Sequence, residues 1–240
     1  MKKEGPNTGA SVRVRLRAVF SEVATFAVPD DGVTFDPLSV TSEPIRDGQE
    51  YGGVRLHLVA GIATAVIRLQ IDIGFGDAVT PEPAVGEFPS LLDFPAPRLL
   101  VYPRETVVAE KLEAVVKLGL VNSRMKDFYD LAAMARLFEF DGALLARALG
   151  ATFRRRGTPF PASRPVAFTP AFTDDGDKQA QWIGFARKAG VNDAGDLPTV
   201  MASVENFAEE PLFAASQGGA WIRRWPAGGP WTRPDPPLSV

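Results

Sequence analysis

The stretch "AEKLEAVVKLGLVNSRMKDFYDL", from Ala109 to Leu131, marks the place where the pattern of the chain becomes helical. At 100° per residue its first helix has one broad apolar face, formed by Val107, Val108, Leu112, Val115, Val116 and Leu118. Lys111 falls inside this apolar sector. A lysine in such a place reaches out to solvent, pairs with a carboxylate or meets an anion of a ligand, and these alternatives stay open here. Glu110, Glu113 and Lys117 lie on the opposite face, where we expect solvent.

A second helix is expected to begin after "VNSR", with Asn122 or Ser123 as its cap. Asp127 and Asp130 are three residues apart and therefore share a face, while Lys126 and Asp130 are four apart. Acidic residues at a helix start also suit the helix dipole, so a purely structural role remains an alternative. The side chains expected to pack inward are Phe128, Leu131 and Met134.

Strand patterns precede this region. Short β-branched runs bounded by Gly or Pro occur between Val33 and Gly76. They follow a flexible lead over 1–10 and an amphipathic helix expected over 11–26, although the alternating start of that helix, Val12 to Leu16, is also compatible with a strand. In "AVIRLQIDIGFG" the odd positions from Ala65 onward are apolar. Period-two alternation then puts Asp72 on the face away from the core, beside Arg68 and Gln70. Taken alone, Asp72 is either a solvated residue at a strand end or a residue that faces a ligand.

The rest of the chain divides into a proline-rich extended loop over 80–103, a helical region and an irregular tail from Gly218 onward, whose last residues are expected to be loose. Helices are predicted near 104–118, 126–138, 141–153, 177–189 and 197–213. The fold class is α+β. A loop after the third of these helices carries the only dense basic cluster, formed by Arg154, Arg155, Arg156 and Arg164. The cluster either contacts phosphate or is an ordinary basic run on the surface.

Composition excludes several classes of function. The 240 residues contain no cysteine and a single histidine, His57, which removes disulfides, thiol catalysis and histidine-rich metal sites. The net charge of −3 gives no global attraction to nucleic acid or a membrane. The N-terminal residues lack the apolar core of a signal peptide, and no apolar run is long enough for a membrane span. A cytoplasmic location is therefore expected.

Several segments together resemble one protein family. They are "YPRETVVAEKLEAVVKLGLVNSRMKDFYDL" (102–131), "LQIDIGFGDAV" (69–79), "EYGGVRL" (50–56) and "TFRRRGTPFP" (152–161). The chain resembles the AbiEii/AbiGii-type nucleotidyltransferase toxins of bacterial abortive-infection and toxin–antitoxin systems, which act in phage defence. The resemblance implies a sheet related to that of DNA polymerase β-like enzymes over 1–100, followed by a helical C-terminal region with a Trp/Pro-rich tail over 101–240.

The resemblance also implies a reaction, which is transfer of a nucleotide from a nucleoside triphosphate to an RNA acceptor, with transfer RNA as a known target class. Mg²⁺ is the expected cofactor, and a cognate antitoxin is an expected partner. Asp72 matches the family's third metal-binding carboxylate, Lys111 the lysine that meets the triphosphate, and Asp127 or Asp130 the acidic residue of the helical half. The residues expected to contact nucleotide or RNA are Lys126, Arg154, Arg155 and Arg156.

The chain departs from the family pattern in one respect. The Gly-Gly or Gly-Ser motif and the following Asp-x-Asp should precede the strands, and no segment in that position matches. We therefore expect an incomplete nucleotidyltransferase sheet that lacks roughly sixty residues, the size of a strand–helix–strand unit, and an inactive chain. The alternatives are a degenerate, non-catalytic remnant that binds nucleotide, RNA or an antitoxin, and an unrelated α/β domain in which these residues are structural.

Overall fold

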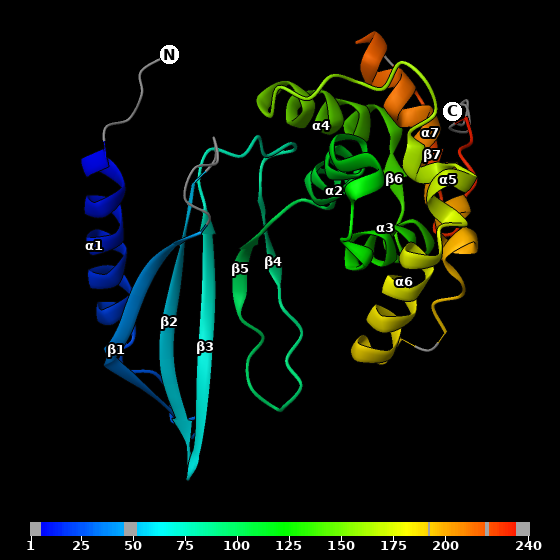
Figure 1. Cartoon of the computed structure of the whole chain (residues 1–240). Coiled ribbons are helices and arrows are strands. Elements are labelled where there is room, and N and C mark those ends of the chain that lie inside the picture. Colours follow the sequence, from blue (N-terminus) through cyan, green and yellow to red (C-terminus); the bar gives the residue numbers. More distant parts are fainter. Residues whose placement is uncertain (1–5, 46–51, 192, 219–220, 234–240) are drawn as a thin grey trace, which may run out of the picture. The chain divides into compact units, whose positions relative to one another are not determined.

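The computed structural model describes residues 6–45, 52–191, 193–218 and 221–233 (Figure 1). The chain divides into two compact units, Met1–Asp77 and Ala78–Val240, and each is described by itself. Helices and antiparallel sheets occur together, so the predicted α+β class is confirmed. The predicted domain boundary near residue 100 remains a prediction. In the described ranges no helix is both long and apolar enough to span a membrane.

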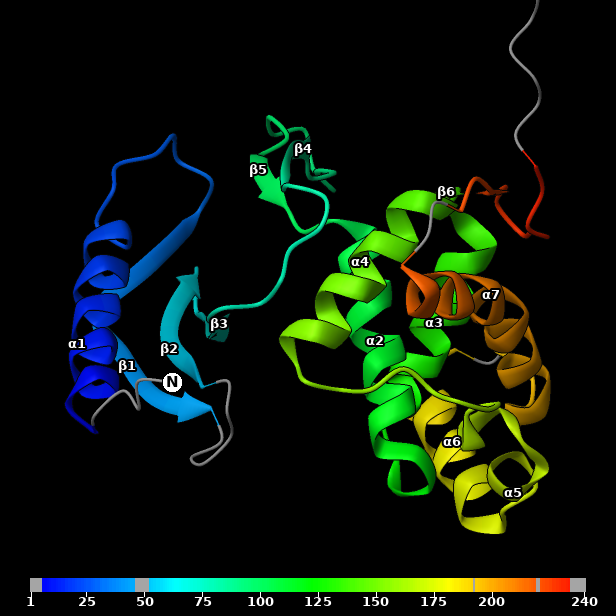
Figure 2. The same ribbon diagram turned by 90° about the horizontal axis from the view of Figure 1, so that it is seen from above.

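The first unit is a three-stranded antiparallel sheet with one helix on it (Figure 2). Its elements are α1 (Pro6–Val23), β1 (Val33–Ile45), β2 (Gly53–Ile62) and β3 (Ala65–Gly74), and the strand order is β1-β2-β3. The predicted helix over 11–26 is confirmed, but it begins at Pro6, so the flexible lead is wrong for residues 6–10. Proline is tolerated in a first helical turn because its missing N–H has no partner there. Residues 1–5 lie outside the described ranges.

The core of the first unit lies between α1 and one face of the sheet. Val40, Val54, Leu56 and Leu58 are buried there, and the residues packed against them are Val12, Leu16, Phe20, Ala24, Leu69, Ile71 and Ile73. The odd residues of β3 thus face the core. The even residues, including Asp72, lie on the opposite face, which confirms the prediction from alternation.

The proline-rich segment over 80–103 was predicted to be an extended loop, and this prediction is wrong for two short stretches. It forms a hairpin of β4 (Ala84–Glu87) and β5 (Arg98–Val101), which pair in antiparallel register. The two strands are free of proline, and the prolines of the segment lie outside them, so every backbone N–H needed for pairing is present. Runs of four residues are too short for alternation to reveal them.

The second unit is mainly helical beyond this hairpin. Its elements are α2 (Arg104–Leu118), η1 (Gly119–Val121), α3 (Met125–Leu137), β6 (Phe140–Asp141), α4 (Gly142–Arg155), η2 (Val166–Phe168), α5 (Pro170–Thr173), α6 (Gly176–Ala189), α7 (Leu197–Gln217) and β7 (Arg224–Trp225). The five predicted helices are confirmed, although α4 and α7 are longer than expected. The predicted cap of α3 is wrong, because the helix starts after Arg124 and has no side-chain cap. Asn122 Oδ1 instead accepts a hydrogen bond from the backbone N–H of Arg124.

The tail is packed onto the helices, as predicted, over residues 221–233. Trp225 and Trp231 are buried, and their indole N–H groups donate to the carbonyls of Ala135 at 2.6 Å and Phe207 at 2.8 Å. These bonds satisfy the polar atoms of large rings that would otherwise be costly to bury. The predicted loose end falls on residues 234–240, which lie outside the described ranges.

Two glycines of α4 provide a matched test of this packing. A Cβ on Gly142 would lie 2.8 Å from ring atoms of Trp221 and 2.9 Å from the carbonyl of Arg223, whereas a Cβ on Gly150 would have no atom within 4 Å. We expect Gly142→Ala to lower the free energy of unfolding by about 1–3 kcal/mol through overpacking. Gly150→Ala should raise it by up to about 1 kcal/mol through helix propensity. Urea unfolding of both variants measures the two effects, and equal effects would contradict the packing of the tail on α4.

Candidate functional site

Lys111 joins the two helices of the opening stretch. Its Nζ lies 2.6 Å from Asp127 Oδ1 and 2.8 Å from Asp130 Oδ2, and its side chain is only 16% exposed. The position follows from the sequence, because the neighbours of Lys111 on α2, Val108 and Leu112, are fully buried. The aliphatic stem therefore crosses apolar surface, and the ammonium emerges at the first turns of α3. Pairing with carboxylates, one of the three alternatives for this lysine, is confirmed.

Two further cations complete the group. Lys126 Nζ lies 2.6 Å from Asp130 Oδ2, and Arg124 Nε lies 2.7 Å from Asp127 Oδ2. The Arg124 N–H is not aligned for a hydrogen bond, so the buried Oδ2 keeps unused acceptor capacity. The five residues Lys111, Arg124, Lys126, Asp127 and Asp130 are called the Lys111 cluster below. Three cations against two carboxylates give it a formal charge of +1.

These contacts shift the pKa values of Asp130 and Lys111 in opposite directions. Burial alone would disfavour charge on Asp130, but hydrogen bonds from Lys111 and Lys126 outweigh it and lower its pKa. Burial likewise acts against the charge of Lys111, but the bonds to Asp127 and Asp130 raise its pKa. Both shifts favour the charged forms of Lys111 and Asp130. The carboxylates of the Lys111 cluster are already matched by cations, so the cluster is better suited to an anion at its rim than to a metal ion.

A second ionic group joins α2 to Arg156, and it shows that the exposure predicted for Glu113 is wrong. Glu113, predicted to face solvent, is buried, and its Oε2 accepts from Arg156 Nη1 at 2.9 Å. Thr158 donates to the other oxygen of Glu113, and Arg156 also contacts Glu110 at 3.3 Å. The physical reason is that α4 packs against this side of α2 and brings residue 156 with it.

The predicted basic cluster is divided by the fold. Arg154 and Arg155 lie in the last turn of α4 and are exposed, rather than on a loop as predicted. Arg156 follows as the C-cap and is engaged by the two glutamates of α2. Arg164 is bound by both oxygens of Glu205. Arg156 and Arg164 are thus engaged by glutamates within the fold, and the four arginines do not form one group.

Asp72, the predicted metal ligand, belongs to the first unit. Both of its oxygens accept hydrogen bonds from Arg55 on β2, at 2.8 and 2.9 Å. The hydrogen bonds from Arg55, partly opposed by desolvation, lower the pKa of Asp72. The contacts among Lys111, Lys126, Asp127 and Asp130 are direct, whereas the predicted convergence of Asp72 with them stays a prediction.

The described residues do not fit the metal that the resemblance implies. Within 6–45, 52–191, 193–218 and 221–233 there is no group of three His, Asp or Glu side chains able to hold a metal ion. Mg²⁺ needs several oxygen ligands in near-octahedral geometry, and Asp72 already shares both oxygens with a guanidinium. A site built from Asp72 alone would hold such an ion weakly.

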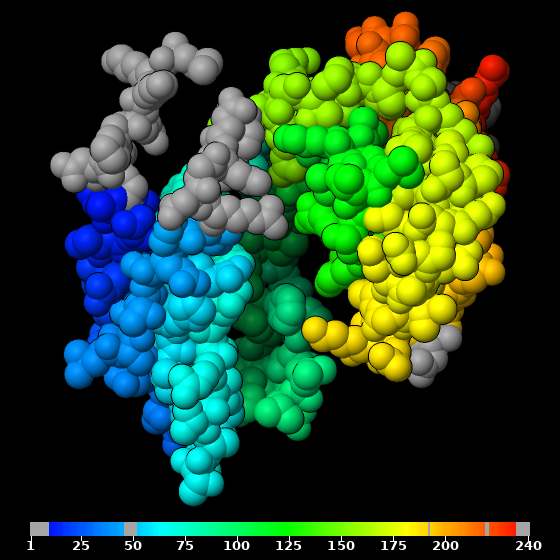
Figure 3. All heavy atoms as spheres, viewed as in Figure 1, coloured from blue at the N-terminus to red at the C-terminus, as the bar shows by residue number. Residues whose placement is uncertain are grey.

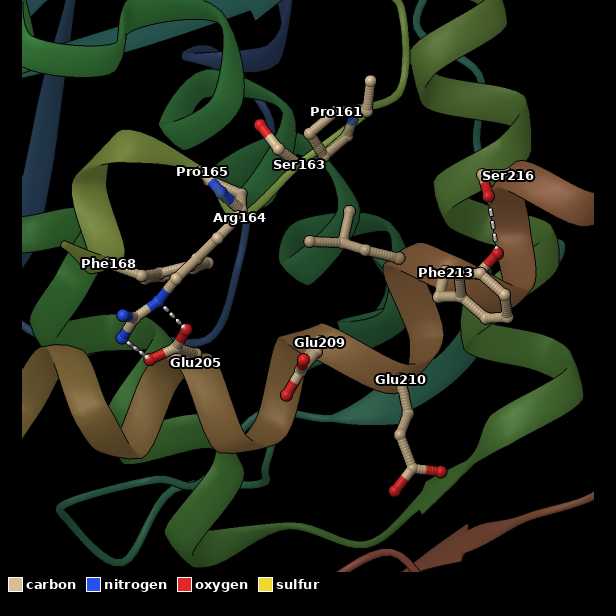
Figure 4. A pocket seen from close by; sticks show the side chains of 12 residues that line it. Pro161, Ser163, Arg164, Pro165, Phe168, Glu205, Glu209, Glu210, Phe213 and Ser216 are labelled. Carbon is tan, nitrogen blue, oxygen red and sulfur yellow. Dashed lines mark hydrogen bonds and ion pairs between the residues drawn. The ribbon is translucent and has the colours of Figure 1, made fainter.

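A pocket of the second unit lies away from the Lys111 cluster. It has a volume of about 430 Å³ and is bounded by the segment 161–165, Phe168 and α7 (Figure 4). Three glutamates of α7 line it, and Glu205 is tied to Arg164 across it. Of the predicted basic cluster only Arg164 lines this pocket, and no residue of the Lys111 cluster does. A smaller one of about 270 Å³ lies between α3, α7 and the tail.

Some of these contacts could not be found from the motifs. Arg124 was missed although it lies three residues before Asp127, a spacing that helical geometry brings together. Arg55, Glu113 and Thr158 carry no local signal, because their partners lie on other elements.

Replacing Lys111 tests the energetics of the Lys111 cluster. We expect Lys111→Met to lower the free energy of unfolding at pH 7 by about 3 kcal/mol, because two carboxylates lose the cation between them. Lys126→Met, which removes a side chain that is 73% exposed, should cost less than about 1 kcal/mol. Urea unfolding of both variants at pH 7 measures the difference.

The effect of Lys111→Met should also depend on pH. The folded-state pKa of Asp130 is lowered, so the stabilisation is present above its unfolded pKa of about 3.9 and is lost as the pH falls through the folded value. The gap between wild type and Lys111→Met should thus narrow between pH 5 and pH 2. A gap that is constant over this range would show that Lys111 acts through packing alone.

Comparison with known proteins agrees with the motifs. A family model described as nucleotidyl transferase AbiEii toxin, type IV toxin–antitoxin system, matches residues 8–207. No curated protein and no solved structure gives a significant match. The matched region includes α1 from residue 8, the three-stranded sheet, the Lys111 cluster and the first half of α7. The chain belongs to the AbiEii nucleotidyl transferase toxin family.

Proposed function

We propose that this chain is a nucleotidyltransferase-type toxin homologue that binds nucleotide or RNA phosphate and does not transfer nucleotides by itself. The observation that carries the proposal is the state of Asp72, whose two oxygens are bound by Arg55, in a described region without a three-residue metal-ligand group. The family reaction we assign to its active relatives is metal-dependent transfer of a nucleotide from a triphosphate to RNA, with transfer RNA as the acceptor and Mg²⁺ as the metal.

The Lys111 cluster supports the binding part of the proposal. An ammonium has three N–H donors, and two of those of Lys111 are directed at Asp127 and Asp130. The third is left for a phosphate oxygen. The side chains of Arg124 and Lys126 are 55% and 73% exposed, so two more cations are available at the rim. Charge-assisted hydrogen bonds to phosphate are among the strongest in proteins.

If the bound ligand is RNA, the proposed binding surface extends from the Lys111 cluster to the end of α4. Arg154 and Arg155 are exposed in the last turn of α4 and would contact the RNA backbone. Such contacts are independent of sequence and weaken with salt. In this assignment residues 1–100 are a partial nucleotidyltransferase core and residues 101–240 the phosphate-binding helical region. A cognate antitoxin is the proposed protein partner, and the cytoplasm is the proposed place of action.

The absence of catalysis is directly testable. The purified chain is incubated with each labelled nucleoside triphosphate, total transfer RNA and Mg²⁺ or Mn²⁺. We expect no label in RNA above a protein-free control, because no set of described carboxylates can hold the metal. Incorporation that disappears in Asp72→Asn would refute the proposal and restore Asp72 to a catalytic role.

The binding role has its own test. We expect Lys126→Gln combined with Arg154→Gln to weaken binding of labelled transfer RNA. The slope of log affinity against log salt should fall by about 1 for each phosphate that the protein no longer neutralises. The matched control removes two exposed cations of α6, with Arg187→Gln and Lys188→Gln. Equal losses of affinity in the two double variants would indicate only a non-specific effect of net charge.

A further inference from the structure

The two edges of the sheet in the first unit differ in how they are protected. The outer strand β1 contains Pro37 and Pro44, and its register with β2 shifts between Asp36 and Thr41. Prolines and bulges are the usual means of blocking an edge against pairing. The other outer strand, β3, has ten residues, no proline and an unbroken register with β2. Among the described residues it pairs with β2 alone, and Figure 3 shows the β2–β3 hairpin in cyan, with its turn at the lower end of the view.

The turn before β3 determines which backbone groups face outward. Ile62 and Ala65 are opposite each other across the two-residue turn Ala63–Thr64, in which Ala63 has φ +50°. A two-residue hairpin turn closes on a hydrogen-bonded pair, and such pairs then recur at every second residue. The odd residues of β3 therefore bond to β2. The even residues, from Val66 to Gly74, direct their N–H and C=O groups to the free edge.

A second β3 fits this edge in one symmetric register. When two copies run antiparallel with Gln70 opposite Gln70, even residues lie opposite even residues, so every outward backbone group meets a partner. This register also places Arg68 of each copy opposite Asp72 of the other. Ile67 then lies opposite Ile73, and Leu69 opposite Ile71. Opposite charges and aliphatic pairs are the combinations that stabilise cross-strand neighbours.

Other registers lose this complementarity. A slide of two residues leaves Arg68 opposite Gln70 or Gly74. A slide of four residues places either Arg68 opposite Arg68 or Asp72 opposite Asp72, and like charges directly opposite are destabilising. A slide by an odd number of residues would place even residues of one copy opposite odd residues of the other. The N–H and C=O groups of those odd residues already bond to β2, so the outward groups of the even residues would find no partner. The charge pattern of β3 thus selects the register centred on Gln70.

The apolar face gives a second, independent reason for a partner. On β2 the residues that face α1 are buried, with Leu56 1% and Leu58 8% exposed. Their neighbours on β3, Leu69 and Ile71, are only half-buried, and Ile67 is 36% exposed. A second β3 would cover this side, and both copies of α1 would then lie on the same face of one six-stranded sheet.

We propose that β3 is the interface of a two-fold symmetric dimer of this chain, formed by antiparallel pairing of two β3 strands about Gln70. The inference does not depend on whether the chain binds nucleotide. In the dimer each Asp72 lies between Arg55 of its own chain and Arg68 of the second copy.

Charge reversal tests the register. We expect sedimentation equilibrium to show a dimer of twice 25.8 kDa, with a dissociation constant raised about tenfold or more by Arg68→Asp or by Asp72→Arg alone. An equimolar mixture of the two single variants should dimerise again, because each unlike pair is re-formed between chains. The double variant Arg68→Asp/Asp72→Arg should also self-associate. A mixture that stays monomeric, or a wild-type chain that is monomeric up to about 100 μM, would overturn the proposal.

A thiol placed at the two-fold axis gives a test that needs no charge change. The chain has no cysteine, so Gln70→Cys carries a single thiol. The two copies of residue 70 should be about 5.5 Å apart at Cα, and a short bis-maleimide cross-linker should join the two thiols efficiently by addition of each thiol to one maleimide. In Val66→Cys the two thiols would lie about 27 Å apart along the strands, and the same linker should fail. Equal linking of the two variants would exclude the register, and linking of neither would exclude the interface.

A proline on the free edge of β3 tests the interface without changing any charge, in case the charge variants fold poorly. Gln70→Pro removes an N–H that faces the free edge and leaves the ladder to β2 intact, which is the position where strands accept proline. This variant should be monomeric with an unchanged circular dichroism spectrum. A dimer that persists in Gln70→Pro would place the interface elsewhere.

Discussion

The organisation of the helical unit depends on one buried ionic contact, the ammonium of Lys111 held between Asp127 and Asp130. The two carboxylates lie on α3 and the lysine on α2, so the contact fixes the start of one helix against the middle of the other. The apolar residues beside Lys111 force this outcome, because a charge among them must find counter-charges at the boundary of the core. Packing and electrostatics thus act on the same side chain.

A common pattern links the ionic groups of the two units. Glu113 is held by Arg156 and Thr158, as Asp72 is held by Arg55. In each case a carboxylate on a regular element is matched by donors before any ligand arrives. Such matching stabilises the ionised form of each carboxylate and opposes the binding of a divalent cation to it.

The sequence predicted what short-range periodicity determines. The 100° spacing of α2 located Lys111 correctly, and the spacing of Asp127 and Asp130 placed both carboxylates on one side of α3. The exposure predicted for Glu113 was wrong, because its burial depends on Arg156, which lies 43 residues away. The β4–β5 hairpin was missed because each strand has four residues between prolines. The predictions that failed are thus those that depend on contacts between elements far apart in the sequence.

All four tryptophans, Trp182, Trp221, Trp225 and Trp231, belong to the second unit. Three of them form a cluster with Phe207, in which ring centroids lie between 4.7 and 5.8 Å apart. Fluorescence excited at the red edge of the tryptophan absorption band therefore comes from the second unit, because the first unit contains no tryptophan. Tryptophan fluorescence thus follows the unfolding of the second unit separately from that of the first, without any added dye.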